Sequence, residues 1–407
     1  MTAADLHRTI DAVWRIESGK LIAALTRIVR DVGVAEDLAQ DALVAALQQW
    51  PEEGIPDRPG AWLMATAKHR AIDLLRRHAL FERKQDQIAR EMAVQFSEPE
   101  EIADDLLRLI FIACHPILST EARVALTLRL LGGLTTDEIA RAFLLPEPTI
   151  AQRIVRAKRA LSEAEVPFEV PSELEARLAS VLEVIYLIFN EGYSTIRTDL
   201  CEEALRLGRI LAELTPDEPE VHGLVALMEI QASRFAARTN ASGEFVLLLD
   251  QDRTKWNYVL ITRGLAALER AGDARTPYVL QAAIAACHAR AHTAEETDWA
   301  RIASLYETLV EVTQSPVVEL NRAVAVGMAH GPAAGLEIAD ALREEPSLRN
   351  YHHLPAVRAD LLAKLGRAEE AREEFERAAA LTRNERERDL LLKRAARTRS
   401  GDEVDVR

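Results

Sequence analysis

The sequence predicts an all-α protein, and three observations lead to this prediction. Alanine, leucine, arginine and glutamate, all good helix formers, dominate the chain. Glycine and proline, at 17 and 16 of 407 residues, are sparse, and runs of β-branched residues are few. From residue 172 almost to the end, stretches with helical patterning alternate with short polar breaks. A chain of this length is expected to form two or three domains, each with its own core.

The N-terminal part is predicted to hold several helices followed by a linker. Residues 5–50 have helical patterning that breaks near residues 31–34, and a further helix is expected at residues 60–77. Residues 81–103 are highly charged and show little apolar periodicity, which is typical of a linker. A short helix is predicted at residues 104–113.

The charge is unevenly distributed along the chain. The net charge is −15, of which −4 falls in residues 1–165 and −11 in residues 166–407. Residues 58–90 are locally basic, with eight lysines and arginines against three acidic residues. A basic stripe on an otherwise acidic protein indicates weak DNA binding, in company with a partner protein.

Cysteine usage and hydropathy predict a cytoplasmic protein without a membrane-spanning segment. The three cysteines, Cys114, Cys201 and Cys287, are widely spaced and odd in number, so no disulfide framework is expected. The N-terminus has no apolar stretch behind a basic start, and no segment approaches membrane-spanning length.

A helix-turn-helix pattern occurs within a compact helical unit predicted at residues 119–161. Thr135 with Glu138 predicts a capping box at the start of one helix. Pro146 and Pro148 predict a tight turn, and Pro148 suits the first position of the next helix. Beyond this unit, Val-Pro pairs at 166–167 and 170–171 mark a domain boundary, because each proline disfavours helix at the residue before it.

The second helix of this motif separates an apolar face from a polar face. At 100° per residue, four residues form the expected buried seam: Ile150, Ile154, Ala157 and Leu161. The opposite face carries Thr149, Gln152, Arg156 and Arg159, with Arg153 and Lys158 flanking it. Hydrogen-bonding and cationic groups in this arrangement suit base edges and phosphates in a major groove. The alternative is a helical hairpin with a solvated basic face.

Residues 61–77 form a second amphipathic pattern. The expected core residues are Met64, Ala67, Ala71, Leu74 and Leu75. The other face carries Trp62, Thr66, His69, Arg70, Asp73, Arg76 and Arg77. A tryptophan on a polar face suits stacking with an unpaired base. The alternative is that Trp62 packs on the preceding proline-rich loop.

Residues 31–47 form a third helical pattern with an acidic side. Ala35, Leu38, Ala39, Ala42 and Ala46 form a small-residue face for close helix packing. Glu36, Asp37, Gln40 and Asp41 line the other side. An acidic patch cannot face DNA, so it is either solvated surface or a docking site for a basic protein.

Taken in their order along the chain, the three segments resemble sigma factors of the extracytoplasmic-function (ECF) type. AEDLAQDAL resembles the core-polymerase-binding helix of sigma domain 2, and AWLMATAKHRAIDLLRR resembles the −10-element helix that follows it. The region from LSTEAR to RAKRAL resembles sigma domain 4. The resemblance covers residues 6–161, and no sigma domain 3 lies between its halves. His69 replaces the usual asparagine, and Ala151-Gln152 replaces the usual lysine-serine pair, so the promoter sequence is not given by the resemblance.

The resemblance implies a set of partners and contact residues. The implied partners are core RNA polymerase, through its β′ clamp helices and its β subunit, and promoter DNA; no cofactor is expected. Contacts to the polymerase are expected from Glu36, Asp37, Gln40 and Asp41. Contacts to the −10 element are expected from Trp62, His69, Arg70, Arg76 and Arg77. Contacts to the −35 element are expected from Thr149, Gln152, Arg153, Arg156 and Arg159. The expected domains are sigma domain 2 at 1–90, a linker at 91–118, sigma domain 4 at 119–165 and an extension at 172–407.

The extension has features of tetratricopeptide (TPR) repeats. Ala359, Ala371, Phe375 and Ala378 match the spacing of one repeat, and a weaker unit at Ala323, Gly335 and Ala339 precedes it by 36 residues. Residues 244–259 break the pattern and are expected to form a hairpin or an ordered loop. We therefore expect a TPR-like superhelix that holds a protein or peptide segment. A subgroup of ECF sigma factors carries such an extension, which implies that it controls sigma activity.

Other functional classes fit the sequence less well. Cys114-His115, His288 with His292, and His352-His353 lack a second ligand pair at suitable spacing, so no metal site is predicted. No nucleophile elbow, phosphate-binding glycine loop or HExxH motif is present, which argues against an enzyme. The main rival is a stand-alone helix-turn-helix regulator with a peptide- or ligand-sensing repeat domain. Such a protein needs no acidic helix at residues 36–41.

Overall fold

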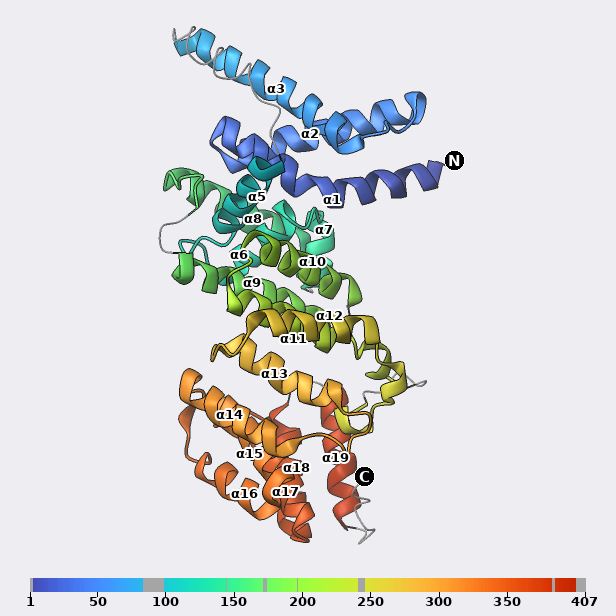
Figure 1. Ribbon diagram of the computed structural model, residues 1–407, viewed down its shortest axis with the longest axis vertical. Coiled ribbons are helices and arrows are strands. Elements are labelled where there is room, and N and C mark those ends of the chain that lie inside the picture. The colour runs from blue at the N-terminus through green and yellow to red at the C-terminus, as the bar shows by residue number, and fades with distance from the viewer. Residues whose placement is uncertain are drawn as a thin grey trace. The chain divides into compact units, whose positions relative to one another are not determined.

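The computed structural model describes residues 3–82, 99–143, 145–170, 174–195, 197–240, 246–382 and 385–399. Within these residues the protein is helical, as the sequence predicts, and within each compact unit many consecutive helices, such as α1 and α2 or α14 and α15, pack side by side (Figure 1). The chain divides into two compact units, residues 1–216 and residues 217–407. None of the described helices combines the length and the apolar composition that a bilayer crossing requires.

The first unit contains nine described helices, and the predicted break in residues 5–50 is confirmed. Asp31 separates the first two helices, and its side chain caps the second by accepting a hydrogen bond from the Val34 amide at 2.9 Å. The fourth described helix starts at Pro99, earlier than predicted, and packs on the first. The helices are α1 (Ala3–Val29), α2 (Val32–Glu53), α3 (Pro59–Glu82), α5 (Pro99–Ala113), α6 (Thr120–Leu130), α7 (Thr136–Ala142), α8 (Glu147–Glu163), α9 (Leu174–Thr195) and α10 (Thr198–Leu214).

The first unit extends beyond the sigma-like segment. Helices α9 and α10 pack on each other and also on α5 and α6. The compact unit therefore ends at Pro216, whereas the sequence suggests an extension that starts at residue 172. The domain boundaries that we expect from the sequence remain predictions, but the first helix pair of the extension is packed with the preceding helices.

The second unit consists of successive helix pairs, in agreement with the predicted repeats. Its α-helices are α11 (Pro219–Ala232), α12 (Tyr258–Ala271), α13 (Pro277–Arg290), α14 (Trp299–Thr313), α15 (Pro316–His330), α16 (Pro332–Ala341), α17 (His353–Lys364), α18 (Ala368–Leu381) and α19 (Glu385–Arg399). Its 3₁₀ helices are η1 (Phe235–Ala237), η2 (Leu248–Asp250), η3 (Arg253–Lys255) and η4 (Pro346–Leu348).

The repeat residues identified in the sequence form the core of this unit. Ala323, Ala339, Ala359, Ala371, Phe375 and Ala378 are all buried. Gly335 allows α15 and α16 to approach closely, because a Cβ atom there would lie 2.5 Å from the Ala323 carbonyl oxygen. Leu320 from α15, Leu336 from α16, and Leu354 and Leu361 from α17 share one apolar cluster, so neighbouring helix pairs have a continuous core.

The segment that breaks the repeat pattern is an ordered loop where it is described. Residues 246–257 contain η2 and η3, while residues 244–245 of the predicted break lie outside the described residues. Buried Arg253 donates hydrogen bonds to the carbonyl oxygens of His288 at 2.8 Å and Ala291 at 2.6 Å. Its guanidinium also lies over the Trp256 ring, 5.0 Å from the centroid. Arg253 thus fastens the loop to the C-terminal end of α13.

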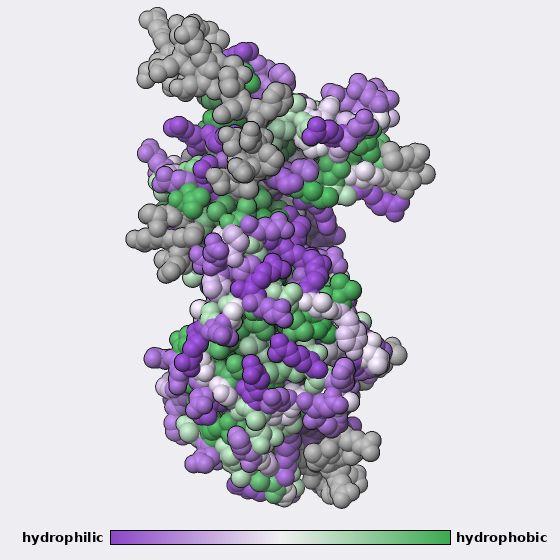
Figure 2. All heavy atoms as spheres, in the orientation of Figure 1, coloured by the Kyte–Doolittle hydropathy of each residue, from purple (hydrophilic) through white to green (hydrophobic). Residues whose placement is uncertain are grey.

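Hydrophilic side chains cover most of the face drawn in Figure 2, and apolar side chains there form separate patches. This distribution follows from helices that each bury one apolar face.

Candidate nucleic-acid interface

Helices α7 and α8 form the helix-turn-helix that the sequence predicts. The Thr135 hydroxyl accepts a hydrogen bond from the Glu138 amide at 3.2 Å, and the Thr135 amide donates to Glu138 Oε2 at 2.8 Å. This capping box starts α7, as expected. Helix α8 begins directly after Pro146, with Pro148 in its first turn. The turn between the helices is therefore set by local sequence.

The two faces of α8 are confirmed as well. The four seam residues Ile150, Ile154, Ala157 and Leu161 are buried. Thr149, Gln152, Arg156 and Arg159 are exposed and Arg153 is half-buried. Arg159 forms an ion pair with Glu163, with 2.6 Å between Nε and Oε1. The five candidate −35 residues thus lie on one helix, with four of them facing outward.

Helix α3 carries the candidate −10 residues, and its core stripe is rotated from the predicted one. Leu63, which we did not expect in the core, is buried with Ala67 and Ala71. Met64, Leu74 and Leu75 are only half-buried. Helix α3 packs against both α1 and α2. The orientation of α3 in this packing determines which residues beside the predicted stripe become buried.

Trp62 is half-buried, and its apolar contact comes from α2. Its ring meets the buried Trp50 ring edge-on, with 5.4 Å between the centroids. The packing alternative therefore has a specific partner, which lies on α2 and not in the preceding loop.

The remaining candidate −10 residues differ in exposure. His69, Arg76 and Arg77 are exposed. Arg70 is half-buried, and its Nη1 lies 3.3 Å from Asp41 Oδ2. This ion pair joins a candidate DNA contact on α3 to a candidate polymerase contact on α2.

The acidic side of α2 is confirmed only in part. The small-residue face, consisting of Ala35, Leu38, Ala39, Ala42 and Ala46, is buried as expected. Asp37 and Asp41 are exposed and Gln40 is half-buried. The expectation that Glu36 lies at the surface is wrong for this structure, because Glu36 is only 2% exposed.

Glu36 is buried because helices from the sigma-4-like segment fold onto α2. Its Oε1 accepts a hydrogen bond from Arg129 Nε of α6 at 2.6 Å. Its Oε2 forms an ion pair with Lys158 Nζ of α8. Neither partner is predicted from the sequence, although Lys158 stands there as a flanking cation of the second motif helix.

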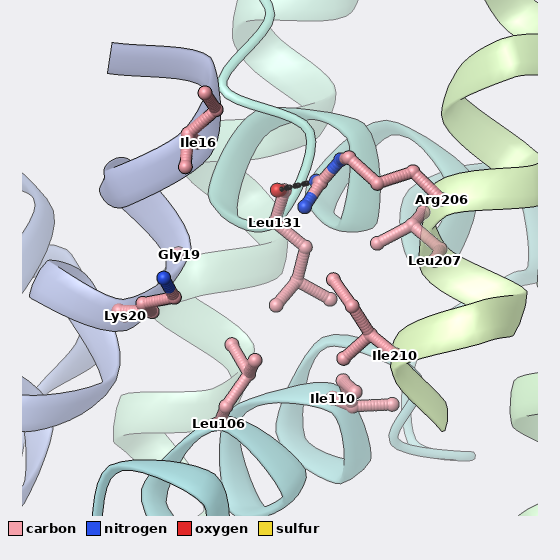
Figure 3. A pocket seen from close by; sticks show the side chains of 9 residues that line it. All are labelled: Ile16, Gly19, Lys20, Leu106, Ile110, Leu131, Arg206, Leu207 and Ile210. Atoms are coloured by element: carbon pink, nitrogen blue, oxygen red, sulfur yellow. Dashed lines mark hydrogen bonds between the residues drawn. The ribbon is translucent and has the colours of Figure 1, made fainter. Parts of the chain in front are cut away.

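Helices α9 and α10 hold the C-terminal ends of α5 and α6 through hydrogen bonds to backbone carbonyls. Arg177 donates to the Phe111 carbonyl oxygen at 3.1 Å, and the Ser180 hydroxyl donates to that of Cys114 at 2.8 Å. Arg206 donates to the Leu131 carbonyl oxygen (Figure 3). Burial raises the pKa of Glu203 although its partner Arg206 opposes this shift.

The same junction encloses a small cavity of about 20 Å³. Side chains from α1, α5 and α10 surround it, together with Leu131 at the end of α6 (Figure 3). Its walls are mostly apolar and it has room for no more than one water molecule. It is therefore a packing defect in a core that four helical segments share.

Of the cysteine and histidine pair at 114–115, Cys114 is buried and His115 is half-buried. The buried Cys114 Sγ lies 3.5 Å from the Thr127 hydroxyl, and burial raises the pKa of the thiol to about 11. Burial also lowers the pKa of His115. Within the described parts of the chain, no group of three or more His, Cys, Asp or Glu side chains is arranged to hold a metal ion.

Three protein families match consecutive parts of the chain. The family "Sigma-70 region 2" matches residues 15–81, which include α2 and most of α3. The family "Sigma-70, region 4" matches residues 108–161, which include α6, α7 and most of α8. A family of unknown function, DUF6596, matches residues 177–272 and so spans the boundary between the two compact units.

Individual relatives match either the whole chain or its N-terminal part. An uncharacterized protein of Rhizobium meliloti, R00370, is 44% identical over 383 residues, or 89% of each chain. The ECF RNA polymerase sigma factor SigL of Mycobacterium tuberculosis is 32% identical over 136 residues, 33% of this chain and 76% of SigL. The probable ECF RNA polymerase sigma factor SigI of the same species is 27% identical over 170 residues, 40% of this chain and 58% of SigI.

Proposed function

The chain belongs to the ECF family of RNA polymerase sigma factors, and from this premise we propose that it binds core RNA polymerase and directs promoter-specific transcription initiation. In this proposal α2 contacts the polymerase through Glu36, Asp37, Gln40 and Asp41. Helix α3 contacts the −10 element through Trp62, His69, Arg70, Arg76 and Arg77. Helix α8 contacts the −35 element through Thr149, Gln152, Arg153, Arg156 and Arg159.

One observation carries the proposal, namely the outward face of α8. A capped first helix and a proline turn present this helix with its apolar seam buried. The exposed side chains then combine an amide, a hydroxyl and arginines. Amides and arginines form paired hydrogen bonds with adenine and guanine edges in the major groove, so this surface suits sequence reading.

The exposed acidic side chains of α2 support polymerase binding. Asp37 and Asp41 are exposed, and the apolar residues Val44 and Leu47 of the same helix are 49% and 38% exposed. A surface that combines carboxylates with apolar side chains suits a basic, partly apolar partner helix. A regulator that acts on DNA alone has no need of such a surface.

We further propose that the helical extension controls the activity of the sigma domains. Its helix pairs build a repeat array, and arrays of this kind present extended surfaces for protein segments. We propose that a segment of another protein binds to the repeat array in residues 217–407.

The test is run-off transcription with purified core polymerase and the full chain on a library of promoter fragments. We expect promoter-specific transcript. The double variant Gln152→Ala/Arg156→Ala should lower its yield about tenfold or more while leaving core binding intact, because each lost base contact costs about 1–3 kcal/mol. Asp37→Lys/Asp41→Lys should instead lower core binding.

Arg141→Ala is a matched control, because Arg141 is an exposed arginine of α7 whose ion pair among the described residues is local, with Asp137 at 2.9 Å. It should leave both readouts unchanged. If the full chain neither binds core nor yields transcript, the polymerase proposal fails and a stand-alone DNA-binding regulator becomes the better account.

A further inference from the structure

The sigma regions contact each other through a buried ionic cluster, which we call the Glu36 latch and define as Glu36, Arg129 and Lys158. The Glu36 side chain is 3% exposed, and those of Arg129 and Lys158 are 19% and 20% exposed. Each carboxylate oxygen of Glu36 has its own cation, one from α6 and one from α8. The Gln40 amide also donates to Oε1, so this oxygen accepts hydrogen bonds from two side chains of the chain itself.

The stability of a buried, charged carboxylate such as that of Glu36 depends strongly on both of its cations. Removing it from water is unfavourable, and the loss of one partner leaves an uncompensated buried charge. Arg129 is itself held in place, because its Nη1 donates to the Leu134 carbonyl oxygen at 3.0 Å. The cluster therefore favours one arrangement of α2 against α6 and α8.

Other contacts lie along the same junction. The Ser162 hydroxyl at the end of α8 donates to Asp31 Oδ2 at 3.0 Å, and Arg15 Nη2 of α1 lies 2.7 Å from Glu138 Oε1 of α7. Gly133, with φ +65°, lies against α1 so closely that a Cβ atom would be 2.8 Å from the Ser18 hydroxyl. The two sigma regions thus meet at polar and close-packed points on both α1 and α2.

We propose that the Glu36 latch is an autoinhibitory contact, in which region 4 occupies with its own basic side chains the site on α2 that a basic partner would use. This inference rests on the proposed function, in which Glu36 contacts the polymerase. With both oxygens paired and the side chain buried, Glu36 cannot accept a further cation until α6 and α8 separate from α2. Polymerase binding then selects an open form of the protein.

The latch leaves the candidate DNA-reading face of region 4 outward. Lys158 points to α2, whereas Thr149, Gln152, Arg156 and Arg159 are exposed. The latch therefore withholds Glu36 from the proposed polymerase surface and leaves the −35 surface free. This separation makes the contact testable with Lys158, which is outside the proposed set of DNA contacts.

The test combines an interdomain distance with core binding in the full chain. Spin labels are placed on cysteines introduced at Gln48 of α2 and Arg141 of α7, both exposed, while the three native cysteines are buried. Lys158→Ala should lengthen and broaden the measured distance, and should tighten binding to core about tenfold by increasing the open fraction. Lys20→Ala is the matched control, because within the described residues Lys20 forms its ion pair with Glu17 of its own helix, at 3.6 Å. It should change neither readout.

A second variant tests the latch in the opposite direction. Asp31→Cys/Ser162→Cys is joined across the junction by a short bis-methanethiosulfonate cross-linker, which reductant cleaves. The cross-linked protein should bind core at least about tenfold more weakly than the same protein after reduction. The pair Asp137→Cys/Arg141→Cys, one turn apart on α7, is the control cross-link, and it should have no effect on core binding.

The outcomes separate the latch from the proposed function. If unmodified protein binds core while Lys158→Ala changes neither distance nor affinity and the cross-link does not weaken binding, the latch proposal is overturned and the sigma proposal stands. If Lys158→Ala lengthens the distance but no form binds core, the polymerase proposal fails and the inhibitory role falls with it. Longer distance, tighter core binding and inhibition by the cross-link together support the latch.

Discussion

The packing of α9 and α10 on the sigma regions predicts that a chain cut at residue 165 is unstable, whereas a chain cut at residue 216 folds. The first cut follows the sequence similarity to sigma factors, which ends near residue 161. The second follows the compact unit. The two proteins differ only by the first helix pair of the extension and the segment that leads to it.

The size of the effect follows from the contacts that the shorter chain loses. Four partly buried side-chain hydrogen bonds disappear, at about 1 kcal/mol each. Three apolar side chains next to α10 become partly exposed, at roughly 1 kcal/mol each. The total of about 7 kcal/mol is comparable with the entire stability of a typical domain. The lost bonds are Arg177 to Phe111, Ser180 to Cys114, Arg123 to Ser180 and Arg206 to Leu131. The side chains next to α10 are Leu106, Ile110 and Leu131.

The assay is urea unfolding of both truncated chains, followed by circular dichroism. With a slope of about 2 kcal/mol per M, the loss should lower the midpoint by roughly 3.5 M or abolish the cooperative transition. Equal midpoints for the two chains would show that α9 and α10 add no stability to the sigma regions, and would refute this reasoning. Comparing residues 1–216 with the full chain in run-off transcription then gives the sign of control by the second unit.

Three further predictions concern single residues. Gly133→Ala should destabilise the first unit by about 2 kcal/mol, measured by urea unfolding, because it combines a positive φ with a clash against α1. As a comparison, Gly366 has φ +75° with open space around it, so Gly366→Ala should lower the stability of the second unit by a smaller amount. Burial, with help from two arginines, lowers the pKa of His288 to about 4. At His288 the unfolded chain therefore binds more protons than the folded chain between pH 6.5 and 4. The stability of the second unit should fall by up to about 3 kcal/mol as the pH drops through this range. The variant His288→Gln should lose this pH dependence, which melting experiments at several pH values would measure. Gly335→Ala should lower the stability of the second unit by about 1–3 kcal/mol in denaturant unfolding, because its methyl group would meet the Ala323 carbonyl; no loss would show that α15 and α16 can separate freely.

Local features of the fold could be predicted from the sequence because they depend on neighbouring residues. The Thr135 capping box, the proline turn and the buried seam of α8 all involve residues within a few positions of one another. The break at Asp31 and the repeat spacing around Ala359 are of the same kind. In these cases helical periodicity and capping chemistry are sufficient.

The sequence by itself therefore determined the helical class, the helix-turn-helix and the family resemblance, while the tertiary structure decided which charged residues are available. Glu36 and Asp37 are adjacent in an acidic run, yet one is buried and the other exposed. The difference arises from Arg129, 93 positions away, and from Lys158 on a different helix. Periodicity assigns a residue to one side of its own helix, but only the packing of distant helices determines whether that side faces water or a paired charge.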